Sequence, residues 1–199
     1  ALTAENPNVR VSAAHALGGN EPLPDRAVDQ LGQSLADASP VVRAAAAKSL
    51  GARGPLSKPK IDLIKQAVKD SDADVRAGAI QALAAIAGDS QDLFPVFTGA
   101  ITDSKAQVRT QAIDAIAKNG NSAKSVLAEL TSALGDEAPS VRSSAARTLG
   151  IIGADAAPAV PRLVLRLKDD DQVARAQAAL ALGRIGSDSS ESLQALGSL

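Results

Sequence analysis

Several residue types that carry chemistry are absent from this 199-residue chain. It has no Cys, Met, Trp or Tyr, only two Phe and a single His. Without Cys there is no disulfide, no thiolate nucleophile and no cysteine-based zinc site, and we expect no cofactor. The formal net charge is −1 and stacking aromatics are lacking, so nothing favours nucleic acid or an anionic membrane. No stretch approaches the roughly 20 apolar residues that span a bilayer, and we expect no membrane insertion.

The sequence does contain a repeat of 33 residues without insertion or deletion. Its arginine column comprises Arg10, Arg43, Arg76, Arg109, Arg142 and Arg175. The column six positions earlier is acidic from its second member and comprises Ala4, Asp37, Asp70, Asp103, Asp136 and Asp169. Three apolar columns keep the same spacing and begin at Val9, Ala13 and Leu17.

Two amphipathic helices fit in each repeat. In the fifth repeat, Val141, Ala145, Leu149 and Ile152 share one face of a helix over 141–152, which we call helix B. A shorter helix A precedes each helix B, with apolar columns that begin at Val28, Leu31 and Leu35. Neither helix can bury its apolar face alone, so the pattern predicts an all-α, right-handed α-α superhelix (a solenoid) of about six helix-turn-helix repeats.

Start and stop signals frame helix B. The predicted N-caps are Asn6, Ser39, Asp72 and Asp171. Prolines fit the first helical turn at Pro7, Pro40 and Pro139. Glycines suit the C-terminal end at Gly120, Gly153 and Gly186.

The unit resembles a HEAT repeat. The matching features are Pro near the start of helix A, Asp at the turn, Val-Arg at the start of helix B and Leu-Gly near its end, as in LTSALGDEAPSVRSSAARTLGIIG. The resemblance covers essentially the whole chain and is greatest to the short bacterial type labelled PBS-lyase HEAT-like. It implies a fold rather than a chemistry, because function resides in sites grafted onto the scaffold.

The arginine column has two interpretations. Six evenly spaced guanidinium groups could bind phosphates or carboxylates of a ligand. The favoured alternative is a structural ladder with the aspartate column, because the planar fork of Arg bonds carboxylate and carbonyl oxygens together. The resemblance also implies that this pair links the turns of neighbouring repeats.

Two further motifs favour structure over chemistry. Asp70, Asp72 and Asp74 resemble the opening of a calcium loop, but Val75 and Gln81 stand where that loop requires Gly and Glu. We therefore expect an acidic turn with an N-cap. The lone His15 has no recurrent acidic partner, so we expect an exposed helix residue and neither a metal site nor a catalytic residue.

A partner would bind helix B, which the resemblance places on the concave face. The helical wheel puts one column opposite the buried positions, and its members are His15, Lys48, Gln81, Asp114, Arg147 and Leu180. Small residues flank this column, while its own charge varies along the array. Such a surface suits an extended protein partner, although it also fits an ordinary solvated face.

These patterns favour a non-catalytic protein-protein interaction scaffold. The alternatives are a subunit of a bilin lyase-like enzyme that handles phycobilin chromophores, and a passive structural spacer. We expect residues 1–199 to form a single HEAT-like repeat domain, a segment of a longer solenoid or multidomain protein. The terminal residues Leu2, Leu193 and Leu196 continue helix A columns, so end-to-end self-association is the alternative. The compartment stays open, with the cytoplasm slightly favoured.

Overall fold

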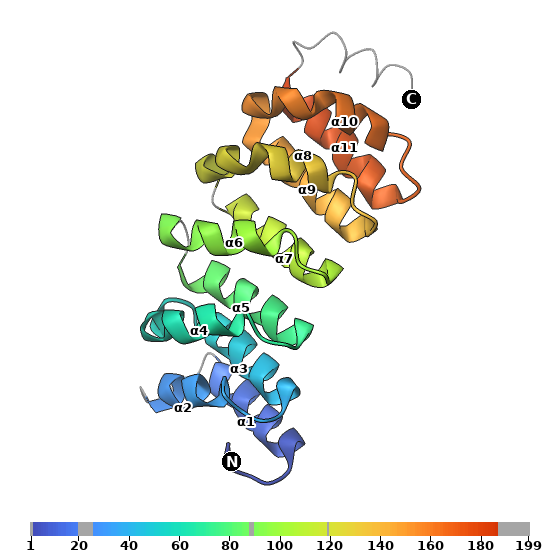
Figure 1. Ribbon diagram of the computed structural model, residues 1–199. Helices are drawn as coiled ribbons and strands as arrows, with labels where there is room; N and C mark the ends of the chain where they lie inside the picture. The colour runs from blue at the N-terminus through green and yellow to red at the C-terminus, as the bar shows by residue number, and fades with distance from the viewer. Residues whose placement is uncertain (1, 20–25, 88–89, 119, 187–199) are drawn as a thin grey trace. The chain divides into compact units, whose positions relative to one another are not determined.

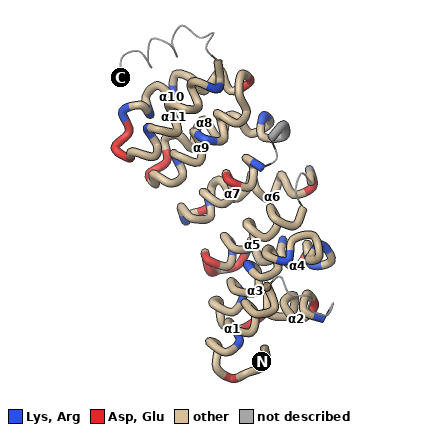
Figure 2. Tube along the Cα trace, turned by 180° about the vertical axis from the view of Figure 1, so that it is seen from behind, with Lys and Arg blue, Asp and Glu red and all other residues tan. Residues whose placement is uncertain are grey.

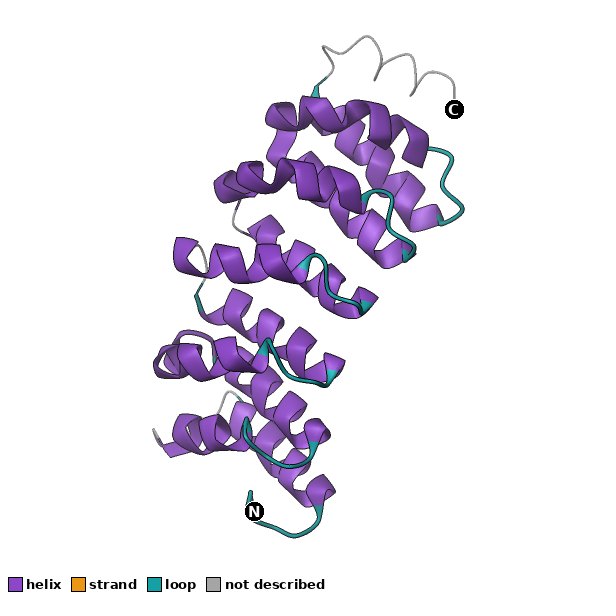
Figure 3. Cartoon of the chain, in the orientation of Figure 1, coloured by secondary structure: helices purple, strands orange, loops and turns teal. Residues whose placement is uncertain are grey.

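The computed structural model describes residues 2–19, 26–87, 90–118 and 120–186. Within these ranges the regular elements are all helices (Figure 3). The α-helices are α1 (Pro7–Gly18), α2 (Arg26–Ser34), α3 (Pro40–Ala52), α4 (Ile61–Ala67), α5 (Ala73–Ile86), α6 (Phe94–Ala100), α7 (Ala106–Lys118), α8 (Leu127–Ala133), α9 (Pro139–Ile152), α10 (Val160–Arg166) and α11 (Gln172–Ile185). Short 3-10 helices lead into helix A as η1 (Gly54–Lys60), η2 (Gln91–Leu93), η3 (Gly120–Val126) and η4 (Gly153–Ala159).

The chain divides into two compact units, Ala1–Val96 and Phe97–Leu199, with the boundary inside α6. In the first unit α3 packs between α1 and α5, while α2 lies against α3 and α4 against α5. In the second unit α9 packs between α7 and α11, while α8 lies against α9 and α10 against α11. Each unit is therefore a layer of helix B covered by a layer of helix A, as the repeat predicts (Figure 1).

The starts of helix B confirm most of the predicted caps. The side chain of Asn6 accepts a hydrogen bond from the amide of Asn8, and Asp72 and Asp171 cap α5 and α11 in the same manner. Ser39 is the N-cap residue of α3, as predicted, but its side chain makes no capping bond. Instead the amide of Ser39 donates to Oδ1 of Asp37 at 2.8 Å, so the turn is held by the aspartate two residues earlier.

The ends of helix B depend on glycine where the backbone turns sharply. Gly153 ends α9 with φ 73° and Gly186 ends α11 with φ 152°, a region where side chains are unfavourable. Gly120 opens η3, as expected for a residue beyond the helix end. The predicted helix A leucines Leu193 and Leu196 lie outside the described residues.

The predicted apolar columns form the core. Leu50, Leu83, Ile116 and Leu149 have no exposed surface, and the same is true of Val42, Val75, Val108 and Val141. The first repeat differs: Val9 is 45% exposed, because no described helix packs on the side of α1 where these valines bury. The burial of a column position therefore depends on contact with the neighbouring repeat as well as on contact within its own repeat.

Glycine also sets how closely two helix B elements approach. A Cβ built at Gly51 would lie 2.9 Å from Cα of Ala82, and one at Gly150 would lie 2.9 Å from Cα of Ala181. At Gly18 it would lie 2.7 Å from Cβ of Ser49. At these three positions the glycine after the helix B leucine is thus needed for close contact between neighbouring repeats.

One segment, Pro139–Arg166, has the length and hydropathy of a membrane span, which the sequence analysis did not anticipate. In the structure this segment comprises α9, η4 and α10, and the left-handed backbone of Gly153 separates α9 from η4. None of these helices exceeds 14 residues, which is short of the roughly 20 that a bilayer requires.

Candidate partner-binding face and the ladder beneath it

The arginine column forms a ladder between repeats. Arg142 donates from Nε to Oδ2 of Asp169 at 2.8 Å and from Nη2 to Oδ1 at 2.6 Å. Its Nη1 donates to the backbone oxygens of Asp136 and Glu137 at 2.9 and 3.0 Å. One guanidinium therefore joins the turn of its own repeat to the turn of the next. This confirms the structural interpretation of the column.

The same pattern recurs within both units. The bidentate pairs are Arg10–Asp37, Arg43–Asp70, Arg109–Asp136 and Arg142–Asp169. In each pair the aspartate follows the arginine by 27 residues, whereas the residue six positions earlier contributes only its carbonyl oxygen. Because a carbonyl needs no particular side chain, Ala4 serves Arg10 in this role at 2.7 Å.

Each ladder aspartate has a second function that the sequence analysis missed. Its Oδ1 also accepts a hydrogen bond from the amide two residues later, as in Asp136 to Ala138 at 2.9 Å and Asp169 to Asp171 at 3.0 Å. The short side chain of Asp reaches its own turn in this way, whereas the longer side chain of Glu does not suit it. The recurrence of Asp without any Glu in this column was the signal that could have revealed it.

Hydrogen bonding stabilises the charged form of these carboxylates. The guanidinium of Arg142 and the amide of Asp171 lower the pKa of Asp169 to about 2, although burial acts in the opposite direction. Arg10 likewise lowers the pKa of Asp37, and Arg43 lowers that of Asp70. Acidic residues are concentrated at the turns that lead into α5, α9 and α11 (Figure 2).

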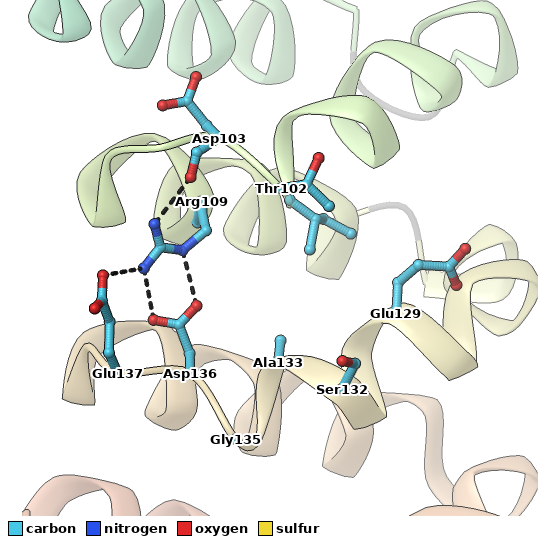
Figure 4. A pocket seen from close by; sticks show the side chains of 10 residues that line it. Thr102, Asp103, Arg109, Glu129, Ser132, Ala133, Gly135, Asp136 and Glu137 are labelled. Atoms are coloured by element: carbon cyan, nitrogen blue, oxygen red, sulfur yellow. Dashed lines mark hydrogen bonds and ion pairs between the residues drawn. The ribbon is translucent and has the colours of Figure 1, made fainter.

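A hollow of about 580 Å³ in the second unit lies beside one rung of the ladder (Figure 4). Its charged lining includes Asp103, Glu129, Asp136 and Glu137, with Arg109 as the cation. The three guanidinium nitrogens of Arg109 are already bonded, to Asp136, Glu137 and the backbone oxygen of Asp103. Arg109 therefore holds two turns together and has no nitrogen left without a partner for a substrate.

The acidic turn before α5 is structural, as predicted. Asp70 pairs with Arg43, and Asp72 caps α5 by accepting from the amides of Asp74 and Val75 at 2.9 and 3.2 Å. These carboxylates are oriented by protein donors rather than towards a common point. Among the described residues no group of three His, Asp or Glu side chains has the geometry of a metal site.

The predicted partner-binding column lies on the helix B layer. His15, Lys48, Gln81 and Leu180 are exposed, and Asp114 and Arg147 are partly exposed. Residues that flank the column include Val41, which is 61% exposed, and Val173, which is 57% exposed. The structure thus presents this column to solvent from helix B of each repeat, and we name it the helix-B face.

In the second unit the charges of this face neutralise each other. Nη2 of Arg147 donates to Oδ1 of Asp114 at 2.6 Å, between α9 and α7. Beside them the hydroxyls of Thr110 and Ser140 lie 3.2 Å apart. The sequence signal for this ion pair was the presence of opposite charges 33 residues apart in one column. The sequence analysis named both residues but did not predict that they pair.

In the first unit the equivalent positions are not neutralised. His15 of α1 and Lys48 of α3 make no hydrogen bond or ion pair with the described residues. Two shallow hollows meet at these side chains. One of about 230 Å³ extends over Val11, Val41 and Ala44, and one of about 260 Å³ extends over Gly18 and Ala52.

Buried polar atoms outside the ladder were also missed. Arg53 donates from Nε to the backbone oxygen of Leu17 at 2.8 Å and so caps the end of α1, while its Nη2 is buried without a partner among the described residues. The hydroxyl of Ser57 in η1 is also buried and has no partner in the described part of the chain. Its column continues as Ser90, Ala123 and Ala156, so the repeat places either a hydroxyl or a methyl group at this position.

Stacked helix pairs, a shared ladder and one recurrent exposed face define an α-helical repeat protein of the solenoid class. Within that class the chain belongs to the HEAT-repeat family. The family model for HEAT repeats matches residues 1–84, 61–130, 94–160 and 128–199.

Solved structures support the fold. An engineered protein is 19% identical with a TM-score of 0.70, over 94% of this chain and 96% of that chain. A designed armadillo repeat protein in complex with the peptide (KR)4 is 16% identical with a TM-score of 0.68, over 90% and 92%. The Escherichia coli protein YibA is 20% identical with a TM-score of 0.66, over 97% and 68%. No curated protein sequence matches the chain.

Proposed function

We propose that this chain is a non-catalytic protein-protein interaction scaffold that binds its partner on the helix-B face. The observation that carries the proposal is the contrast between neighbouring columns of helix B. Ala46, Ala79 and Ala112 have no exposed surface, yet the column two positions later is open to solvent and changes from Lys48 to Gln81 to Asp114. A constant buried interface beside a variable exposed column suits recognition of an extended partner.

The ladder supports this proposal by fixing the spacing of the exposed column. Each rung ties two successive turns with two charge-assisted hydrogen bonds and at least one bond to a carbonyl oxygen. Side chains on the helix-B face are therefore held at a regular interval, which lowers the conformational cost of binding an extended ligand. The designed armadillo protein bound to (KR)4 is a protein of similar fold that carries a peptide.

The finer family assignment is also part of the proposal. The 33-residue unit, with Asp at the turn, Val-Arg at the start of helix B and Leu-Gly near its end, favours the short bacterial PBS-lyase HEAT-like type. Nothing in the described residues favours a bilin-handling subunit. A shift of bilin absorbance on mixing with the chain would support that alternative against the scaffold.

The test is capture of binding proteins with variants that reverse charge on one face at a time. Lys48→Glu with Arg147→Glu alters the helix-B face in both units. Lys69→Glu with Arg162→Glu makes the same charge change at two exposed positions outside helix B, one in the turn after α4 and one in α10. We expect a saturable partner that the first variant loses and the second retains, with circular dichroism showing that both are folded.

A photo-crosslinking residue at Gln81 then locates the contact, because Gln81 is exposed on helix B. Crosslinking at Gln81 but not at Leu165, an exposed helix A position, supports the helix-B face. Equal loss of the partner in both variants, or crosslinking only at Leu165, would overturn this choice of face. If the wild-type chain captures no saturable partner, the result would favour a passive structural spacer. Light scattering of the purified chain over a concentration series tests end-to-end self-association separately.

A further inference from the structure

On the helix-B face of the first unit, two side chains that can donate hydrogen bonds have no acidic partner among the described residues. His15 and Lys48 lie side by side on α1 and α3 and line both hollows there. Neither side chain has a partner among the described residues, whereas Arg147 is already bonded to Asp114 in the second unit. An ammonium group and an imidazole N–H are hydrogen-bond donors that suit a carboxylate.

Apolar surface adjoins these donors. Val41 is 61% exposed and lines the 230 Å³ hollow together with Val11, Ala44 and Ala45. Asp72 and Asp74 line the same hollow at the start of α5, where Asp74 holds the repeat position that Val41 holds in α3. A ligand whose acidic group lies beside Lys48 therefore has its apolar group near Val41, and the negative charge of the two aspartates disfavours the reverse orientation.

We propose that this groove binds a protein segment in which one acidic and one branched apolar residue lie three positions apart. The carboxylate lies between His15 and Lys48, and the apolar side chain packs on Val41. This inference rests on the proposed function and names the chemistry of the partner in the first unit.

The spacing follows from helix geometry. Positions 41 and 48 of α3 are seven residues apart, which is about 10 Å along the helix axis. A segment in the polyproline II conformation has three residues per turn and rises about 3.1 Å per residue, so positions i and i+3 face the same side about 9 Å apart. Such a segment lying along the groove matches both features without bending.

The experiment measures fluorescence anisotropy of short labelled peptides with the full chain. The principal probe has Glu and Ile three positions apart in a Pro- and Ser-rich context, and controls place them adjacent, replace Glu by Lys, or replace Glu by phosphoserine. We expect the principal probe to bind, and the adjacent and Lys peptides to bind at least about tenfold more weakly.

Charge reversal supplies the decisive comparison. Lys48→Glu should weaken the Glu peptide by about tenfold or more and strengthen the Lys peptide, a rescue that loss of folding cannot produce. Lys69→Glu, with the same charge change outside the groove, should leave both affinities unchanged. A further control peptide, with Ile replaced by Ser, should lose affinity for the wild-type chain because Val41 is then left uncovered.

Other outcomes overturn the inference in recognisable ways. Tighter binding of the phosphoserine peptide, or equal binding of the Lys peptide, would exclude carboxylate recognition while leaving the scaffold proposal intact. No peptide binding at all would also overturn it. Failure of the scaffold proposal has a different signature, which is that the wild-type chain captures no saturable protein partner.

Discussion

Arg142 and Asp169 meet along the full edge of the carboxylate, with Nε–Oδ2 at 2.8 Å and Nη2–Oδ1 at 2.6 Å. Only 1% of the Asp169 side chain is exposed, and Arg166 adds a third contact at 3.0 Å. A carboxylate removed from water to this extent is stable only when its charge is compensated. The pair joins two repeats, so its protonation state affects the interface between them.

Acid should therefore weaken the fold through Asp169. Its pKa is about 2 in the folded chain, below the roughly 3.9 of an unfolded aspartate. Because the folded pKa is the lower one, this stabilisation is complete above the unfolded pKa and is lost as the pH falls through the folded pKa. Urea unfolding between pH 6 and pH 2 should show the decline begin near pH 4, and Asp169→Asn should make it shallower. An identical pH profile for Asp169→Asn would contradict this assignment.

Arg109→Ala should destabilise the second unit by about 1–3 kcal/mol, because it leaves Asp136 and the carbonyl of Asp103 without their donor. Denaturant unfolding followed by circular dichroism measures the change. Lys118→Ala is the control, since Lys118 is exposed on the same helix. Equal stability of Arg109→Ala and wild type would contradict the structural role of the ladder.

Leu149→Ala should cost about 2–5 kcal/mol, because Leu149 is fully buried between repeats and truncation leaves a cavity. Ile151→Ala on the same helix is the matched control, with Ile151 42% exposed, and should cost much less. Thermal and urea unfolding of both variants test the register of α9. A larger effect at Ile151 than at Leu149 would mean that the register is wrong.

Two glycines of one column should respond in opposite directions to the same substitution. Gly150→Ala should destabilise by about 1–3 kcal/mol, because the new methyl group would meet the backbone of Ala181. Gly183→Ala should stabilise by about 0.5–1 kcal/mol, since no atom of the described residues lies within 4 Å of the added Cβ and alanine favours the helix. Melting curves of the two variants should shift to opposite sides of wild type. Shifts of the same sign would contradict the close contact between α9 and α11.

Ser57→Ala should stabilise the first unit by about 1 kcal/mol, because it removes a buried hydroxyl that has no partner. Alanine fits this position elsewhere, as Ala123 and Ala156 are fully buried at equivalent places. Urea unfolding with and without the substitution provides the measurement. A loss of stability would show that the hydroxyl is bonded in solution, for example to water.

The sequence by itself determined the repeat, the two helices in each unit and the residues that form the core. Columns such as Val42, Ala46 and Leu50 recur at 33 residues with helical spacing, and burial of an apolar face depends chiefly on that spacing. The recurrence of Arg and Asp at the same spacing also predicted the ladder, because an interface that all repeats share needs the same residues in each repeat.

Tertiary structure alone decided which groups meet. The arginine bonds the aspartate 27 residues later rather than the one six residues earlier, because stacking brings the next turn to the guanidinium while its own turn offers only carbonyls. Stacking likewise pairs Arg147 with Asp114 and leaves Lys48 and His15, beside Val41, without partners among the described residues. Local periodicity fixes the face of the helix on which a side chain lies, but it does not fix which side chains of two repeats touch. That contact depends on the distance between the packed helices, which is short because Gly51 and Gly150 have no side chain.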